Sequence, residues 1–175
     1  MTDNDLITPE QRRAFVRRNH TCVVSYARRT APPSMSIVHY VMDGETIVFL
    51  TMAQRQKAKA VRRLGQLSVC VLDGPAGGLS WPPEYLVVDG AAEVVTNLDY
   101  VVARAMEVGP IMLGHPVPAE AEPVVRDMMV REDRVAIRVT PESTFHSPSV
   151  HPDADDADAA RRMEHGLGAR LPWAA

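Results

Sequence analysis

Short β-type runs separated by turn signals constrain the fold of this chain more than any other feature. Runs rich in Val, Ile, Thr and aromatic residues recur from residue 21 onward, and Asp-Gly pairs at 43–44, 73–74 and 89–90 follow three of them. Asp-Gly is a strong hairpin signal, because its residues tolerate the positive φ angles of tight two-residue turns. Hairpins pair strands antiparallel, so we expect a mainly β chain whose sheet closes most economically as a barrel.

The same patterns predict the individual elements. Strands are expected at 21–26, 36–42, 46–51, 67–72, 85–88, 91–95 and 134–139. Helices are expected at 9–18, 52–64, 98–108 and 125–130. The first helix begins with Thr8, Pro9 and Gln11, which together form an N-terminal capping signature. Six or seven mostly antiparallel strands with a few helices are therefore the expected architecture.

The composition changes after Ser147. Residues 148–175 carry a dense acidic patch, and their main core-forming side chains are Leu167, Leu171 and Trp173. A segment with so few apolar residues buries too little surface to order itself. We therefore expect one barrel domain at 1–147, followed by a flexible tail or by an arm that orders only against a partner.

Charge and composition exclude several classes of protein. The net charge of −3 argues against a chain that coats nucleic acid, which would be clearly basic. Cys22 and Cys70 both lie in apolar runs, which favours buried reduced thiols over a disulfide or a metal pair. No apolar run approaches the roughly 20 residues of a membrane-spanning helix, and no signal-peptide segment opens the chain. These features predict a cytoplasmic protein that binds neither nucleic acid nor membrane.

The common catalytic motifs are absent from the sequence. The six histidines show none of the H-x-x-x-H or H-E-x-x-H spacings of zinc sites, so no metal site is expected. The chain also has no G-x-S-x-G nucleophile elbow, no P-loop and no dinucleotide-binding glycine fingerprint. No catalytic residue can therefore be named from these motifs.

The stretch RQKAKAVRR at 55–63 carries five positive charges and no acid. Nothing at i,i+4 positions offsets the repulsion between these charges, so a bound anion would relieve it. The stretch directly follows the apolar run 47–52, and a helix N-terminus at a strand end offers free amides to an anion. Thr51, Arg55 and Lys57 supply a hydroxyl, a planar guanidinium and an ammonium, which suit phosphate. Two interpretations stay open: a phosphate site, or a solvated helix face.

The order of these segments resembles that of a known family. The segments are SIVHY at 36–40, DG at 43–44, VFLT at 48–51, RQKAKAVRR at 55–63, SVCVLD at 68–73, YLVVDGAAEV at 85–94 and RVAIRV at 134–139. They resemble the pyridoxamine 5′-phosphate oxidase-like split β-barrel superfamily. Within it they look closest to the actinobacterial flavin/deazaflavin oxidoreductases that use coenzyme F420, an 8-hydroxy-5-deazaflavin.

The resemblance implies a fold, an activity and a partner. The fold is a split β-barrel like that of FMN-binding proteins, and the assembly is a homodimer with cofactor sites at the interface. The activity is hydride transfer between reduced coenzyme F420 and a small conjugated organic substrate. Two alternatives remain: an FMN-dependent oxidase or reductase of the pyridoxamine-phosphate-oxidase type, and a non-catalytic flavin- or haem-binding carrier or sensor.

The resemblance also implies where the cofactor phosphate is held. Arg55 and Lys57 match the family's phosphate-holding Arg-x-Lys, with Gln56 between them. Lys59 and the arginines at 62–63 either extend an anionic groove toward a polyglutamate tail or are solvated.

The ring of the cofactor is expected beside two strands. Thr51 and Met52 match the strand end next to the ring system, and Ser36 to Val38 match the strand under its face. Three polar groups that could donate a proton lie nearest the expected cleft, although none is assigned as catalytic: His39, Tyr40 and Tyr85. The loop GPAGGLSWPP departs from the family pattern, so Trp81 either lines a substrate pocket or packs.

Overall fold

The computed structural model describes residues 8–72, 85–147 and 170–174. The strands are β1 (Thr21–Tyr26), β2 (Ser34–Asp43), β3 (Thr46–Met52), β4 (Gln66–Leu72), β5 (Tyr85–Val95), β6 (Arg134–Ser147) and β7 (Leu171–Pro172). The helices are α1 (Pro9–Arg18), α2 (Gln56–Leu64), α3 (Leu98–Leu113), the 3₁₀ turn η1 (Ala119–Ala121) and α4 (Glu122–Arg131).

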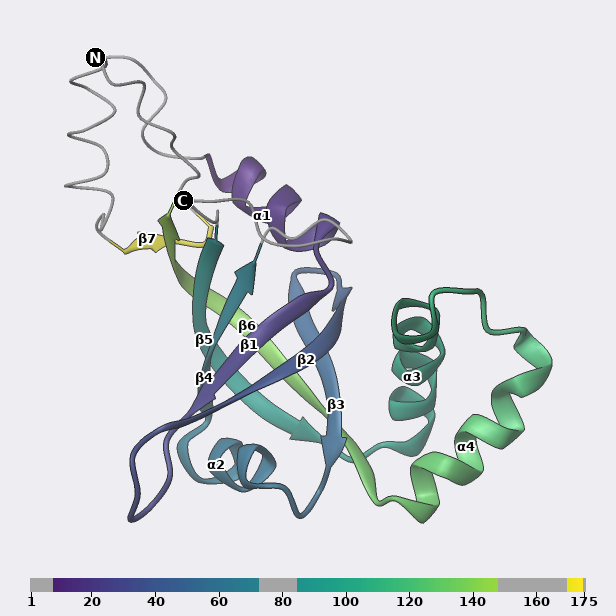
Figure 1. Ribbon diagram of the computed structural model, residues 1–175. Helices are drawn as coiled ribbons and strands as arrows, with labels where there is room; N and C mark the ends of the chain where they lie inside the picture. Colours follow the sequence, from purple (N-terminus) through teal and green to yellow (C-terminus); the bar gives the residue numbers. More distant parts are fainter. Residues whose placement is uncertain (1–7, 73–84, 148–169, 175) are drawn as a thin grey trace.

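The strands form one antiparallel sheet that closes on itself (Figure 1). Neighbouring strands follow the order β3-β2-β1-β4-β5-β6-β7, and β3 pairs back onto β6. The first six strands of this order therefore make a closed barrel, and β7 adds a short seventh strand at the β6 edge. The expected mainly β, split-barrel architecture is confirmed.

The barrel interior is aliphatic, because alternate residues of each strand point inward. Phe49 and Ile137 are fully buried in this interior. Helices close both ends: α1 contributes Phe15 to the core at one end, and α2 contributes Ala58 and Val61 at the other (Figure 1). The two helices thus occupy opposite ends of one hydrophobic core.

A second apolar cluster lies outside the barrel, beneath α3 and α4. Val48 of β3 and Ala136 of β6 are fully buried there against Val101 and Met129 of the two helices. This layer covers one side of the barrel and leaves the outer face of β1, β4 and β5 without a helix among the described elements (Figure 1). Within the described parts of the chain, no helix is long and apolar enough to cross a membrane.

The Asp-Gly signals had different outcomes. Gly44 has a φ of 61° and turns β2 into β3, so this hairpin is confirmed. The pair at 89–90 is not a turn, because β5 runs through it with only a register shift. A Cβ at Gly90 would lie 2.1 Å from the carbonyl oxygen of Thr140, so glycine is required for the close approach of β6. The pair at 73–74 lies outside the described residues, as does Trp81.

Several element boundaries also differ from the expectation. The basic helix begins at Gln56 rather than at residue 52, because residues 52–55 form a turn in which the Arg55 N–H donates to the Met52 carbonyl (3.1 Å). Helix α3 continues through Pro110 to Leu113, beyond its expected end at residue 108. The first helix and its capping box on Thr8 are confirmed.

The segment 170–174 packs on the barrel of its own chain. Strand β7 pairs antiparallel with β6, and Trp173 is only 5% exposed within the main core cluster. The Arg12 guanidinium, on α1, donates to the Pro172 carbonyl at 2.7 Å. Residues 148–169 lie outside the described residues, so the division of the chain into barrel and tail stays a prediction.

Candidate functional site

The candidate site lies where β2 and β3 separate. The two strands pair from their hairpin turn as far as Tyr40 and Phe49. Beyond this point, among the described strands, β2 pairs only with β1, and β3 pairs only with β6. The strands diverge toward α2, which lies at the open end (Figure 1). The barrel is thus split along one seam, and the chain enters α2 at that seam.

Four of the residues predicted to meet the cofactor ring lie on these separated strand ends. Thr51 is 4% exposed at the end of β3, and Met52 beside it is half-buried. Val38 of β2 packs against the barrel core, two residues from Ser36. The hydroxyl oxygen of Ser36 is buried and has no hydrogen-bond partner among the described residues. A buried hydroxyl without a partner costs free energy, so a polar ligand atom would be favourable here.

Helix α2 begins without a side-chain cap. Arg55 occupies the N-cap position in an extended conformation (φ −67°, ψ 149°), and its side chain does not bond the first-turn amides. The first N–H groups of a helix have no partner within the helix. Together with the helix dipole they attract an anion to this end. The first turn of α2 contains no acid that would compete.

No described residue is an acidic partner of the cations next to this N-terminus. Arg55 and Lys59 are exposed, Lys57 is half-buried, and none of the three makes an ion pair with a described residue. Burial, and then the neighbouring Arg55 guanidinium, lower the pKa of Lys57. A bound anion would act in the opposite direction, because it favours the charged ammonium. Gln56, between the two cations, is exposed.

The last two arginines of the basic stretch differ from the first three cations. Arg62 donates to the Ala53 carbonyl at 2.7 Å, and Arg63 donates to the Ala27 carbonyl at 2.7 Å. Arg62 therefore binds the connection between β3 and α2, and Arg63 binds the loop between β1 and β2.

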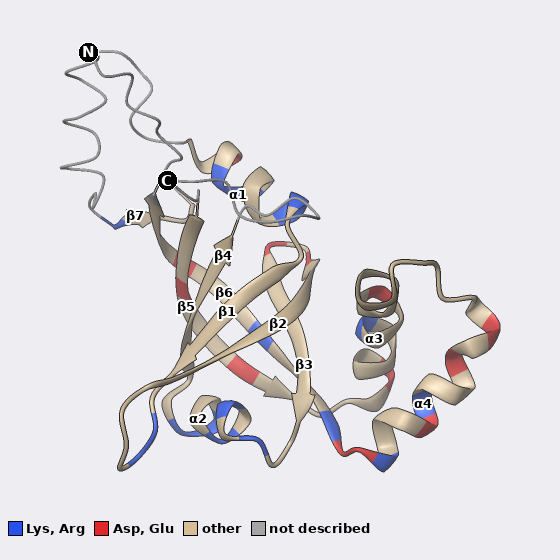
Figure 2. Ribbon diagram, viewed as in Figure 1, with Lys and Arg blue, Asp and Glu red and all other residues tan. Residues whose placement is uncertain are grey.

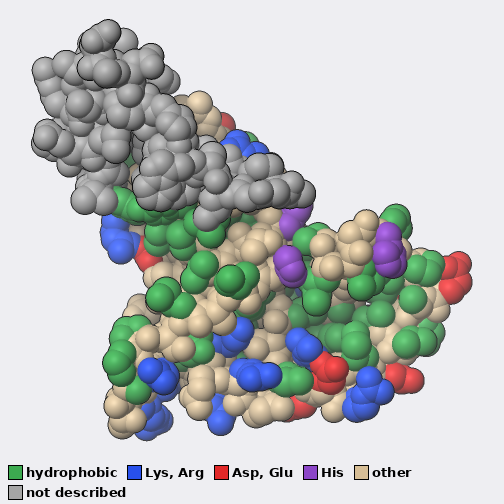
Figure 3. Space-filling model, viewed as in Figure 1, with side chains coloured by type: hydrophobic (Ala, Val, Ile, Leu, Met, Phe, Trp, Pro, Cys, Tyr) green, Lys and Arg blue, Asp and Glu red, His purple; other side chains and the backbone are tan. Residues whose placement is uncertain are grey.

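Lys and Arg dominate this end of the barrel. Figure 2 shows basic segments on α2 and on the loop between β1 and β2, and neither segment contains an acid. In the space-filling view, basic side chains lie over the same end of the molecule (Figure 3). The local surface is therefore positive although the whole chain is not.

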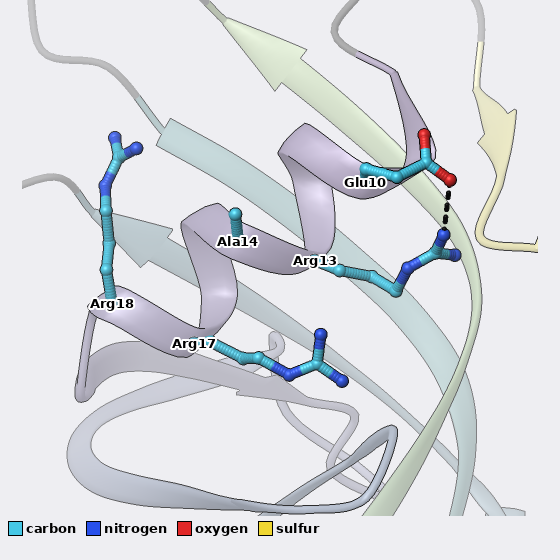
Figure 4. A pocket seen from close by; sticks show the side chains of 5 residues that line it. All are labelled: Glu10, Arg13, Ala14, Arg17 and Arg18. Atoms are coloured by element: carbon cyan, nitrogen blue, oxygen red, sulfur yellow. Dashed lines mark hydrogen bonds and ion pairs between the residues drawn. The ribbon is translucent and has the colours of Figure 1, made fainter.

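A shallow hollow on α1, at the opposite end of the barrel, contains cations that differ from those of α2 because acids lie beside them. It is lined by Glu10, Arg13, Ala14, Arg17 and Arg18 (Figure 4). Arg13 pairs with Glu10 at 2.8 Å, and Arg17 pairs with Glu45. Arg13 and Arg17 therefore already have acidic partners within the chain, unlike the cations at the start of α2.

A groove on the outer face of β4, β5 and β6 contains a carboxylate that already has partners within the chain. The Asp89 carboxylate accepts a hydrogen bond from the Ser68 hydroxyl and pairs with Arg170. Its charge therefore has partners within the chain.

The prediction that Tyr40 could donate a proton at the cleft is wrong. Tyr40 is fully buried in the core, where its hydroxyl donates to the Val16 carbonyl at 2.7 Å and burial raises its pKa. His39 lies 3.0 Å (Nδ1 to Oγ1) from the Thr21 hydroxyl, and Tyr85 is half-buried. No catalytic residue is assigned.

The thiols do not contribute to the site. Cys22 and Cys70 are both free, as expected, and burial raises the pKa of Cys22 to about 12. Among the residues described, no group of three or more His, Cys, Asp or Glu is placed to hold a metal ion.

Two residues near the site were not expected from the sequence. Arg134 lies opposite Met52 in the β3–β6 register, and the Asp133 carbonyl accepts from the Ala53 N–H at 2.8 Å. Alternating hydrophobicity marked the strand that begins at 134 but carried no information about its partner. The pairing of β3 with β6 brings these two residues to the site, and no local sequence pattern indicates that pairing.

One family of known proteins matches most of the chain. The model of the pyridoxamine 5′-phosphate oxidase family matches residues 8–147. The chain belongs to this family. Membership indicates a flavin-binding protein of oxidoreductase type and confirms the resemblance at the level of the superfamily. None of the curated proteins compared with the chain matches it significantly.

Solved structures share the fold of this family member. A conserved hypothetical protein from Mycobacterium tuberculosis is 21% identical with a TM-score of 0.69, over 90% of this chain and 98% of its own. A protein named F420 reductase is 21% identical with a TM-score of 0.54, over 75% and 93%. A putative pyridoxamine 5′-phosphate oxidase from Listeria innocua is 15% identical with a TM-score of 0.55, over 79% and 96%. These likenesses show the split-barrel fold and leave the choice of cofactor open.

Proposed function

We propose that the chain is an oxidoreductase that transfers a hydride between reduced coenzyme F420 and a small conjugated organic substrate. The observation that carries the proposal is the set of unpaired cations around an uncapped helix N-terminus. Arg55, Lys57 and Lys59 have no acidic partner among the described residues, and they lie at the start of α2, directly after the end of β3.

The residues present fit a phosphorylated flavin-type cofactor. The Arg55 fork, the Lys57 ammonium and the first-turn amides of α2 would hold the phosphate. The unpartnered Ser36 hydroxyl, with Val38, Thr51 and Met52, would meet the ring. When bound, the cofactor supplies the hydride chemistry. The chain's own residues bind it, orient it and exclude water, which is consistent with a sequence that shows no catalytic dyad.

The seam edge of β2 supports binding of a flat heteroaromatic ring. Between Ser34 and His39, the one described strand that pairs with β2 is β1. Alternate backbone N–H and C=O groups on the other edge of β2 therefore have no partner among the described strands. Such an edge supplies donors and acceptors in a row, as the polar rim of a deazaflavin or flavin requires.

We also propose that a second copy of the chain completes the site. On the outer face of β2, Met35 is 70% exposed and Ile37 is 74% exposed, on either side of Ser36. The strand registers extend this apolar face in a row across the sheet: Ile37, Val23, Cys70, Val87 and Phe145. A two-fold contact would bury this self-complementary row. It would also cover the seam beside Ser36.

A binding screen tests the proposal. Purified protein is titrated with coenzyme F420, FMN, FAD and haem, and the same screen is run on the Arg55→Met/Lys57→Met variant. The proposal predicts binding of the deazaflavin in about the micromolar range, with loss in the variant. Tight binding of FMN with indifference to the deazaflavin would favour the FMN-dependent alternative. A Soret band on addition of haem, with no hydride transfer, would favour the carrier.

A further inference from the structure

The connection between β3 and α2 is held through one peptide group. The Ala53 N–H donates to the Asp133 carbonyl at 2.8 Å. The Ala53 carbonyl accepts from the Arg62 guanidinium at 2.7 Å. The next bond along the chain is that of the Arg55 N–H to Met52, which closes the turn before α2. The segment that presents Arg55 is therefore fixed from both sides.

Asp133 has an unusual backbone conformation. It is the non-glycine residue with positive φ in the described parts of the chain (49°), at the junction between α4 and β6. Its N–H donates to the Val130 carbonyl at 3.1 Å. Left-handed backbone is costly for most side chains and least so for Asp and Asn. Asp133 thus suits this position through its backbone, which directs a carbonyl to Ala53.

Arg62 reaches back along α2 to the connection that precedes the helix. Arg62 follows Lys59 by three residues within α2, so these two side chains lie on the same side of the helix. Its hydrogen bond to Ala53 links the last turn of the helix to the start of the site. A side chain with this bond acts on the geometry of the site as well as on its charge.

We propose that Asp133 and Arg62 are positioning residues of the anion site. They hold the Ala53 peptide and thereby fix Arg55 and the first-turn amides of α2. The inference rests on the proposed function of this site as a phosphate binder. Asp133, in the turn between α4 and β6, thereby affects the affinity for phosphate from outside the site, because small displacements of binding groups have large effects.

Two substitutions at Asp133 separate position from charge. Asp133→Asn and Asp133→Val remove the same negative charge, so charge alone predicts that both variants bind phosphate more tightly. Asn tolerates left-handed backbone and Val does not. Positioning therefore predicts about tenfold weaker phosphate binding for Asp133→Val and no weakening for Asp133→Asn, in line with the value of a charge-assisted hydrogen bond.

A matched pair on α2 tests the other side of the peptide. Arg62→Met and Arg63→Met remove the same charge from adjacent positions, but only Arg62 bonds Ala53. We expect Arg62→Met to weaken phosphate binding several-fold more than Arg63→Met does. Arg62→Lys, which keeps a donor, should restore most of the affinity.

The readout is a titration of the full chain with inorganic phosphate, followed through the amide NMR signals of residues 56–58, with thermal unfolding recorded for each variant. Equal affinity of the two Asp133 variants, or a lower unfolding temperature with unchanged affinity, would overturn the positioning role while the site stands. Absence of phosphate shifts in the unmodified chain would instead refute the proposed function, and the positioning role with it.

Discussion

Helices α1 and α2 close opposite ends of one barrel, and both are strongly basic. Among the described residues, α1 pairs two of its arginines with acids, whereas the first cations of α2 have no acidic partner. Helix α1 carries four arginines in ten residues. The capping box on Thr8 satisfies the Gln11 amide, and three of the α1 guanidiniums reach Glu10, Glu45 and the carbonyls of the C-terminal segment. Helix α2 has no side-chain cap and no acid nearby in sequence. Charge content alone therefore does not distinguish the two helices; the partners that the fold supplies to each charge do.

Removing the unpaired cations of α2 should have the largest effect on binding. Arg55→Met/Lys57→Met is expected to weaken cofactor binding about 100-fold or more, because each charge-assisted bond to phosphate contributes about 1.5–3 kcal/mol. The matched change on α1, Arg13→Met/Arg17→Met, should alter affinity less than about twofold, since those charges are distant and screened. Equilibrium titration measures the affinity of both variants, and similar losses in the two would show that α1 and α2 do not differ in anion binding.

Removing the C-terminal support of α1 should affect stability and leave binding intact. Trp173 is 5% exposed, and Arg12 and Arg13 of α1 donate to the carbonyls of its segment. Trp173→Ala is expected to lower the free energy of unfolding by about 3 kcal/mol, as for other buried aromatics. Denaturant unfolding measures the loss. An unchanged unfolding midpoint would show that the segment does not support α1 in solution.

Freeing a guanidinium on α1 should not turn it into an anion site. Glu45→Gln removes the acid that pairs with Arg17 and lies 4.0 Å from Arg13. The expected loss of stability is about 0.5 kcal/mol, as for other exposed ion pairs. Phosphate should still fail to bind, because the Thr8 side chain already occupies the Gln11 amide. Phosphate binding at α1 in this variant would show that cations alone suffice.

Lys57 should be slightly destabilising when no anion is bound. Burial and Arg55 lower its pKa in the folded state, so the charged form is disfavoured there relative to the unfolded chain. Stability from this group should therefore rise as the pH increases through the folded pKa toward the ordinary lysine value. At neutral pH, Lys57→Met should stabilise the protein by a few tenths of a kcal/mol, a small gain because the side chain is half exposed.

Chemical denaturation without phosphate checks this gain, and Lys59→Met is the exposed control with no expected change. A lower stability of Lys57→Met at neutral pH would contradict the assigned pKa direction.

Local signals predicted the barrel well. The Asp43-Gly44 turn and the capping box on Thr8 depend on neighbours within a few residues, so both were readable from the sequence. The turn predicted at Asp89-Gly90 is wrong, because glycine is required there by the close approach of Thr140, which is distant in sequence. The start of α2 was misplaced because no capping side chain marks it.

The candidate site was only partly readable for the same reason. The cations of the basic stretch are consecutive in sequence, and their lack of partners follows from composition nearby. Tyr40 was misplaced because its inward direction depends on closure of the barrel. Asp133 approaches Ala53 only through the pairing of β3 with β6, which periodicity does not encode.

The most direct test of the central claim is a phosphate titration of the unmodified chain, followed by amide NMR at the N-termini of both helices. We expect saturable shifts at Gln56, Lys57 and Ala58 that weaken as salt is raised, and no comparable shifts at Glu10 and Gln11. Shifts of equal size at α1, or none at the start of α2, would contradict the claim.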